Sequence, residues 1–276
     1  MLMSKKVVVS GSFDHLRSHD VRFLEEVSKL GEVQVLLWSD ETIRTRESRE
    51  PNFPQEERLF MLQAIRYVEQ VTLVTGQFDR DSLPQVDEIQ PDIWVVDTDS
   101  DTPEKGQYCE SLGLAYRVLE PTDLQGFPVL EDAKSNHSPA RKKVLVTGCY
   151  DWLHSGHVRF FEETSELGDL YVIVGHDENI RLLKGEGHPM FSQDERRYLV
   201  GAIRYVKQAV ISTGHGWMDA EPEIDKIKPE IYTVNEDGDK PEKRAFCQGR
   251  GIEYVVLKRN PKEGLPRRES TVLRCF

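Results

Sequence analysis

Long apolar runs, paired cysteines and an excess of positive charge are all missing from this chain of 276 residues. No apolar run approaches the roughly 20 residues that a membrane-spanning helix needs, so we expect no membrane span. The first residues, MLMSKKVVVSGSFD, contain no apolar segment followed by a cleavage site, and their short run of valines is typical of a strand. These absences favour a cytoplasmic protein.

The scarcity of cysteine and of positive charge excludes further classes. The four cysteines include no Cys-x-x-Cys pair, which argues against a disulfide scaffold and a zinc site. We expect no metal-ligating side chains. The 48 acidic residues outnumber the 36 basic ones, for a net charge of −12, so nucleic acid is not an expected partner. If the ligand carries phosphate, the positive charge that binds it must be local.

What the chain does contain is a duplication. The stretch Val7–Glu26, VVVSGSFDHLRSHDVRFLEE, aligns with Val144–Glu163, VLVTGCYDWLHSGHVRFFEE, at an offset of 137 residues. The match then continues at an offset of 138 through most of both halves. A repeat this long is a whole domain rather than a solenoid unit. We predict one domain over 1–130, a linker over 131–140 and a second domain over 141–276.

Each half alternates between strand patterns and helix patterns, which predicts a parallel sheet flanked by helices. The fold class is therefore α/β, with two tandem Rossmann-like domains. In such sheets the ligand crevice lies at the carboxyl ends of the strands. In the second half we predict strands at 144–148, 170–175, 208–213, 230–235 and 252–257, and helices at 157–167, 193–206, 222–228 and 240–250.

The stretch Val144–Glu163 carries the clearest chemical signal. A buried strand passes through a short turn of small residues into a helix, so free backbone N–H groups and the helix dipole favour phosphate there. His154 and His157 lie at this point, separated by Ser155 and Gly156. Their imidazoles can donate hydrogen bonds to phosphate oxygens and carry positive charge when protonated.

Two further segments suggest phosphate binding. Lys184 lies in a glycine-rich stretch, NIRLLKGEGHPM, that could form a lid over a triphosphate. Near the end of the chain, Arg268, Ser270 and Thr271 follow the last predicted strand. Serine and threonine can cap a helix or hydrogen-bond a phosphate, and arginine can hold its charge with two parallel hydrogen bonds.

The strand, the Gly148-Cys149-Tyr150-Asp151 turn and the His-Ser-Gly-His segment together resemble the cytidylyltransferase-like nucleotidyltransferases, whose signature runs from G-T-F-D to H-x-G-H. The tandem layout is similar to that of the phosphoethanolamine cytidylyltransferases. The resemblance implies transfer of CMP from CTP to a phosphorylated small alcohol in phospholipid precursor biosynthesis, with release of pyrophosphate. It also implies Mg²⁺ on the triphosphate and a possible homodimer.

The resemblance also implies roles for individual residues. His154, His157 and Lys184 would be catalytic, holding the triphosphate and stabilising the transition state. The family carries K-x-K around Lys184 and a longer R-T-x-G-[IV]-S-T-[TS] motif at the end, whereas this chain has Glu186 and a shortened motif. The implied nucleotide-binding and phosphate-binding residues are Gly148, Cys149, Tyr150, Asp151, Gly156, Asp177, Arg204, Arg268, Ser270 and Thr271.

The first half is an internal control for these assignments. Arg17 stands at the position of His154, His19 at that of Gly156, Asp20 at that of His157 and Glu47 at that of Lys184. The first domain therefore lacks the histidine pair, and Asp20 places negative charge where phosphate would bind. We expect it to be catalytically inactive, with the alternative that it binds a different ligand.

Several alternatives remain open. No base-reading residue decides between CTP and ATP, so adenylyl transfer to a phosphorylated sugar or another phosphate ester is the first alternative. A non-catalytic, regulatory nucleotide-binding protein is the second, and Glu186 and the shortened terminal motif favour it. The sequence leaves the acceptor and the oligomeric state undecided.

Overall fold

The computed structural model describes residues 4–86, 89–129 and 141–273. These form two compact units, Met1–Gly126 and Phe127–Phe276. The predicted linker over 131–140 lies outside the described residues. The division falls slightly before the predicted end of the first domain at 130. The reason is that Phe127 packs on Tyr198 and its carbonyl accepts a hydrogen bond from Arg197 at 2.9 Å.

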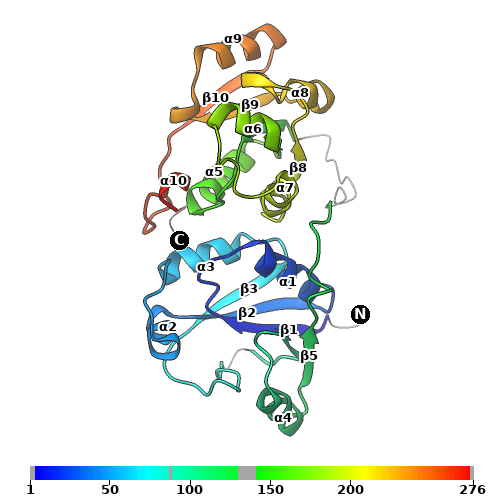
Figure 1. Ribbon diagram of the computed structural model, residues 1–276, viewed down its shortest axis with the longest axis vertical. Helices are drawn as coiled ribbons and strands as arrows, with labels where there is room; N and C mark the ends of the chain where they lie inside the picture. Colours follow the sequence, from blue (N-terminus) through cyan, green and yellow to red (C-terminus); the bar gives the residue numbers. More distant parts are fainter. Residues whose placement is uncertain (1–3, 87–88, 130–140, 274–276) are drawn as a thin grey trace. The chain divides into compact units, whose positions relative to one another are not determined.

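Unit 1 is a five-stranded parallel sheet with helices packed around it (Figure 1). The strand order is β3-β2-β1-β4-β5. Its elements are β1 (Lys6–Gly11), α1 (Ser18–Ser28), β2 (Glu32–Trp38), α2 (Asp40–Glu47), α3 (Gln55–Gln63), β3 (Val68–Val74), β4 (Ile93–Asp97), α4 (Pro103–Leu112) and β5 (Ala115–Leu119).

Unit 2 repeats this architecture, with the strand order β10-β9-β6-β7-β8, again all parallel. The order reverses at β6, which pairs with β7 on one side and β9 on the other, and this reversal opens a crevice at the carboxyl ends. Its elements are β6 (Lys143–Gly148), α5 (Ser155–Glu166), β7 (Asp169–Val174), α6 (Asp177–Lys184), α7 (Gln193–Gly201), β8 (Val206–Ile211), η1 (Gly216–Met218), α8 (Glu221–Ile227), β9 (Ile231–Asn235), η2 (Glu236–Gly238), α9 (Pro241–Arg250), β10 (Glu253–Leu257) and α10 (Ser270–Leu273).

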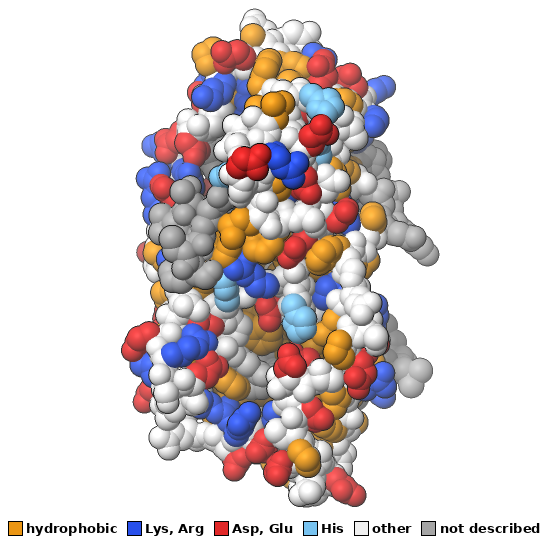
Figure 2. Space-filling view, viewed as in Figure 1, with side chains coloured by type: hydrophobic (Ala, Val, Ile, Leu, Met, Phe, Trp, Pro, Cys, Tyr) orange, Lys and Arg blue, Asp and Glu red, His pale blue; other side chains and the backbone are white. Residues whose placement is uncertain are grey.

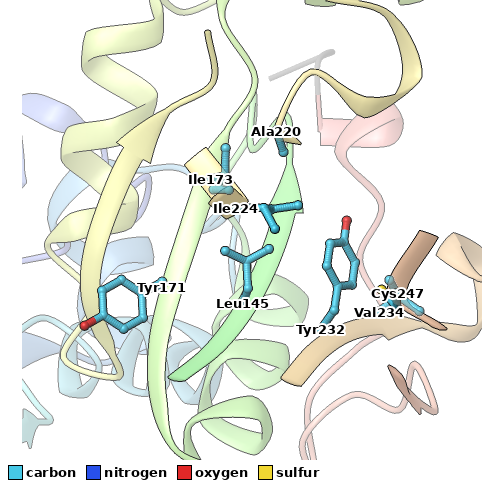
Figure 3. Packing of buried hydrophobic residues seen from close by; sticks show 8 residues of the cluster. All are labelled: Leu145, Tyr171, Ile173, Ala220, Ile224, Tyr232, Val234 and Cys247. Carbon is cyan, nitrogen blue, oxygen red and sulfur yellow. The ribbon is translucent and has the colours of Figure 1, made fainter. Parts of the chain in front are cut away.

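The core of unit 2 explains why β6 lies in the middle of the sheet. Val144, Leu145 and Val146 are fully buried, because a central parallel strand is covered on both faces. On one face Leu145 packs with Ile173 of β7 and Ile224 of α8, which Figure 3 shows side by side. Burying each such side chain contributes about 1.5–3 kcal/mol to folding. The rigid end of β6 is therefore a firm base for the loop that follows it.

The predicted helices and strands of unit 2 are confirmed, with two differences. The segment ending at Lys184 is the helix α6 rather than a loop, and helix α7 ends at Gly201 instead of reaching 206. Glycine is a poor helix former, and after Gly201 the chain makes a turn before β8 begins. Within the described ranges, no helix is long and apolar enough to cross a membrane.

Candidate active site

The loop after β6 turns sharply because of one unusual backbone conformation. Tyr150 has φ of +52°, in the left-handed region, and Phe13 has φ of +43° at the same place in unit 1. The Tyr150 ring folds back over Gly148, where a Cβ atom would lie only 2.7 Å from the ring. The ring also meets the edge of His157 at a centroid distance of 5.3 Å. Gly148 and Tyr150 thus shape the loop and support a histidine.

Asp151 ties this loop to the one that follows α6. Its carboxylate is 5% exposed and accepts hydrogen bonds from the backbone N–H groups of Met190, at 2.7 Å, and Phe191, at 3.1 Å. In unit 1, Asp14 accepts from Asn52 and Phe53 in the same way. Because both units use this contact, the aspartate has a structural role even though Asp151 also lines the cleft described below.

The two histidines of the motif stack at the start of α5. Their ring centroids are 3.9 Å apart, and His154 is the N-cap of the helix. The Nδ1 atom of His154 accepts a hydrogen bond from the Gly156 N–H at 3.1 Å, so the proton of the neutral ring lies on Nε2. That Nε2–H donor is buried and has no hydrogen-bond partner among the described residues. The histidine pair therefore holds an unused donor at a helix N-terminus.

Both imidazoles are neutral in the ligand-free protein. Burial, together with the neighbouring His157, holds the pKa of His154 far below its usual value. Burial and the nearby Arg259 guanidinium lower the pKa of His157 to about 3. The positive charge that a protonated imidazole would carry is thus absent at neutral pH, and the rings can act as hydrogen-bond donors. The positive charge beside them comes from arginine and lysine.

Gly156 leaves room for the His154 ring. A Cβ atom on Gly156 would lie 3.0 Å from that ring and 3.9 Å from the carbonyl oxygen of Arg268. The same carbonyl accepts a hydrogen bond from Arg259 at 3.2 Å, so the C-terminal segment passes directly over the start of α5. This contact places Arg268 beside the histidines, as expected from the sequence, and its charge contributes to the lowered pKa of His154.

A cleft of about 240 Å³ lies at the carboxyl ends of β6 and β9, where the strand order reverses. Lys184, the last residue of α6, lines it, and no ion pair of Lys184 occurs in the described part of the chain. Ser270 also lines the cleft, and its hydroxyl donates to the Trp152 carbonyl at 3.4 Å. Of the predicted site residues, those lining the cleft are Gly148, Cys149, Tyr150, Asp151, His157, Lys184 and Ser270.

Charge is mixed over the rest of the surface. Figure 2 shows acidic and basic side chains interspersed among the described residues of the visible face, with no broad basic patch there. This agrees with the net charge of −12. The cations near the histidines are Lys184, which lines the cleft, and Arg259 and Arg268, which lie beside Gly156 at the start of α5.

The structure does not bring Asp177 to the cleft lining. Its carboxylate accepts a hydrogen bond from the fully buried Arg196 at 2.8 Å. Arg196 also donates to the carbonyls of Cys149, Gly175 and Phe191, and thereby joins three loops. Arg58 and Asp40 form the same arrangement in unit 1. Asp177 therefore helps to hold the scaffold and does not line the cleft.

The expectation for Arg204 is not supported either. Arg204 is exposed and lies two residues before β8, at the amino end of a strand, while the cleft lies at the carboxyl ends. Short α7 ends before it, contrary to the predicted helix that would have carried it. Thr271 is part of the α10 backbone, and its side chain lies outside the described structure.

Sequence reasoning missed several residues around the cleft, and four of them carry polar or charged groups used below. Thr233, Asn235 and Lys243 line it from β9 and α9. Arg259 lies after β10 and lowers the pKa of both histidines. A signal existed in the repeat alignment, because Arg259 corresponds to Pro121 and Thr233 to Val95.

Unit 1 has a cleft of similar size, about 260 Å³, at the same place in its sheet, but the chemistry is different. The Asp20 carboxylate accepts a hydrogen bond from the Arg17 backbone N–H at 2.7 Å. A side chain of the protein therefore occupies the helix N-terminus that would attract phosphate. Glu47, at the position of Lys184, pairs with Arg49 at 2.5 Å. The observations favour the expectation that unit 1 does not bind a triphosphate.

The described residues do not form a site for Mg²⁺. No group of three His, Cys, Asp or Glu side chains suited to a metal ion occurs among them. The carboxylates of Asp151 and Asp237 line the cleft, but the first accepts backbone hydrogen bonds and the second pairs with Arg259.

Comparison with known proteins gives the same assignment as the motif. A FAD synthase from Ferroglobus placidus is 36% identical over 125 residues, which cover 44% of this chain and 78% of that protein. The bifunctional protein HldE of Campylobacter concisus is 37% identical over 99 residues, covering 35% of this chain and 20% of HldE.

Among solved structures, a lipopolysaccharide core biosynthesis protein from Thermoplasma volcanium is 25% identical with a TM-score of 0.37, and the match covers 47% of this chain and all of that one. The profile of the cytidylyltransferase-like family matches residues 8–123 and 145–237, which together are more than half of the chain. The two matched segments fall in the two units. The chain therefore belongs to the cytidylyltransferase-like family of nucleotidyltransferases.

Proposed function

We propose that unit 2 transfers an adenylyl group from ATP to a small molecule that carries a phosphate ester. The observation that carries this proposal is the buried, unpaired Nε2–H of His154 at the N-terminus of α5. A buried donor without a partner destabilises the ligand-free protein. An acceptor such as a phosphate oxygen removes this penalty when it binds.

The expected reaction needs positioning and charge stabilisation, and no protein nucleophile. An oxygen of the acceptor's phosphate attacks the α-phosphorus of the nucleotide. The bond between the α-phosphorus and the oxygen bridging to the β-phosphate breaks, and pyrophosphate leaves with that electron pair. His154 and His157 would donate hydrogen bonds to the phosphate oxygens as charge develops on them. Lys184, Arg259 and Arg268 would supply the positive charge.

The choice of ATP over CTP rests on the relatives. FAD is an adenylyl group bonded to the phosphate of flavin mononucleotide, so that the two phosphates form a pyrophosphate linkage, and FAD synthases are among the proteins similar to this chain. The CTP specificity and the phospholipid-precursor role expected from the sequence find no support among these relatives. The acceptor in this proposal is accordingly a phosphate ester such as a flavin phosphate or a sugar phosphate.

A pyrophosphate-release assay tests the proposal. The purified chain is incubated with Mg²⁺, with ATP or CTP, and with flavin mononucleotide, a sugar 1-phosphate or phosphoethanolamine in turn. We expect release with ATP and one of the first two acceptors. Release with CTP alone would restore the cytidylyl assignment. Nucleotide binding without release for any pair would favour the regulatory, non-catalytic alternative.

A further inference from the structure

The wall of the cleft formed by β9 and α9 carries polar residues that have no role in the phosphate site. Thr233 and Asn235 lie at the carboxyl end of β9, and Lys243 lies in the first turn of α9. His157 of α5 and Lys184 of α6 line the same cleft from the other side. The cleft thus has a second group of side chains, contributed by the neighbouring strand.

Thr233 has a hydroxyl that the fold does not use. The residue is 1% exposed, lines the cleft, and its Oγ1 has no hydrogen-bond partner among the described residues. Val95 occupies the same place in unit 1 and is also 1% exposed. Threonine and valine have the same shape and differ in the hydroxyl, so the scaffold itself accepts valine here. An unpaired buried hydroxyl destabilises the protein unless a ligand pairs with it.

Asn235 and Lys243, which line the same wall, also differ from their counterparts in unit 1 in a way that favours a ligand. Asn235 replaces Asp97 of unit 1 and removes a negative charge from this wall. Lys105 of unit 1 donates to the Ser100 carbonyl, whereas no hydrogen bond or ion pair of Lys243 occurs in the described part of the chain. The Lys243 ammonium lies 6.0 Å from the centre of the Tyr232 ring, and burial lowers the pKa of its amine.

We infer that Thr233, together with Asn235 and Lys243, binds hydrogen-bond acceptor atoms in the sugar and base of the nucleoside triphosphate. This rests on the proposed function. The α5 side of the cleft suits phosphates, because it combines a helix N-terminus, imidazole donors and Lys184. A nucleotide held there by its phosphates presents its nucleoside to β9. Thr233 is then a specificity-determining residue, which valine in unit 1 cannot replace.

The test compares two probes on the full chain, Mg²⁺ with ATP or CTP and Mg²⁺ with inorganic tripolyphosphate. Affinity for each is measured by calorimetry or thermal shift in wild type and in Thr233→Val. We expect the ligand-free variant to melt at the same or a higher temperature than wild type. Its affinity for the nucleotide should fall about fivefold to tenfold, the effect of one lost hydrogen bond, with tripolyphosphate affinity unchanged.

Matched variants keep the test decisive. Val95→Thr, the reverse change in unit 1, should lower the melting temperature and leave nucleotide affinity unchanged. Thr233→Ser should retain nucleotide affinity and Thr233→Ala should lose it, which gives the same comparison if Thr233→Val folds poorly. Unchanged nucleotide affinity, or an equal loss for tripolyphosphate, would overturn this inference alone. If wild type bound neither ATP nor CTP, the proposed function and this inference would both fail.

Discussion

The two stacked histidines are neutral donors placed among cations. Burial and positive neighbours keep the pKa values of His154 and His157 low, and the Nδ1 bond to Gly156 fixes the tautomer of His154. A neutral imidazole that donates from Nε2 needs no protonation step before it meets a phosphate. Lys184, Arg259 and Arg268 provide the charge that the rings lack.

Acid should therefore destabilise the protein through these rings. A histidine with a lowered folded pKa binds its proton only in the unfolded chain. Its stability contribution is complete above pH 6.5 and declines as the pH falls from 6.5 towards the folded pKa of about 3 for His157. For His157→Asn we expect a smaller loss of unfolding free energy between pH 7.5 and pH 5 than for wild type, by up to about 2 kcal/mol. Urea unfolding at the two pH values measures this, and parallel pH profiles would contradict the burial of a neutral ring.

Gly156 offers a second prediction at this scale. A methyl group there would meet the His154 ring at 3.0 Å, so the ring must shift away from its place at the helix N-terminus. We expect Gly156→Ala to reduce the rate of pyrophosphate release about tenfold or more, because even a small displacement of a donor to the transition state slows the reaction strongly. Gly249→Ala in α9, where a Cβ meets nothing within 4 Å, is the control and should retain activity. Full activity of Gly156→Ala would show that the ring position does not matter.

At the scale of elements, the site depends on loops that one aspartate in each unit holds in place. Asp151 binds the backbone of Met190 and Phe191, as Asp14 binds that of Asn52 and Phe53. The loop held by Asp151 follows Lys184, the cation at the cleft. The same architectural contact thus has a functional consequence in unit 2 alone.

Substituting the aspartate in each unit separates its effect on stability from its effect on activity. Asp151→Asn and Asp14→Asn should each lower the free energy of unfolding by about 1–3 kcal/mol, because each leaves buried backbone donors poorly paired. Asp151→Asn should also reduce kcat/KM, while Asp14→Asn should leave it near the wild-type value. Denaturant unfolding and pyrophosphate release, measured on the same preparations, give both quantities. Equal effects of the two substitutions on kcat/KM would contradict the claim that only the loop held by Asp151 affects activity.

Much of the element pattern could be predicted because it is local. The buried β6 valines, the glycine-containing turn and the apolar spacing of α5 lie within one continuous stretch of sequence. Helix α6 was missed because its sequence, DENIRLLK, leads directly into glycines that indicate a loop. The repeat alignment marks Arg259 and Thr233 as differences between the two halves, but it does not place them near the histidines, since only tertiary packing brings β9 and the segment after β10 there.

Arg204 and Asp177 are expected site residues that the structure does not place in the lining of the cleft. Both belong to recognisable motifs, but one lies at the amino end of β8 and the other is engaged by Arg196. Their counterparts in unit 1, Arg66 and Asp40, are the same residue types. Residues shared by a unit with the histidine pair and a unit without it are better candidates for the scaffold than for chemistry.

At the scale of the whole molecule, the duplication separates fold from chemistry. Both units have the same strand order and clefts of similar size, of about 240 and 260 Å³. They differ where the helix N-terminus meets the cleft. In unit 1 Asp20 caps the helix, while in unit 2 the corresponding residue is His157. In unit 1 a carboxylate therefore occupies the helix N-terminus, whereas in unit 2 the cap is the His154 ring, whose Nε2–H donor has no partner among the described residues.

The most direct test of the account changes these two matched positions in the full chain. Pyrophosphate release is measured for wild type, His157→Asn and Asp20→Asn with ATP, Mg²⁺ and the best acceptor. We predict that His157→Asn lowers kcat about 10²-fold to 10³-fold, the usual effect of losing a donor to the transition state. Asp20→Asn should stay within about twofold of wild type, because unit 1 takes no part in the chemistry. Equal losses for the two variants, or full activity of His157→Asn, would contradict the account.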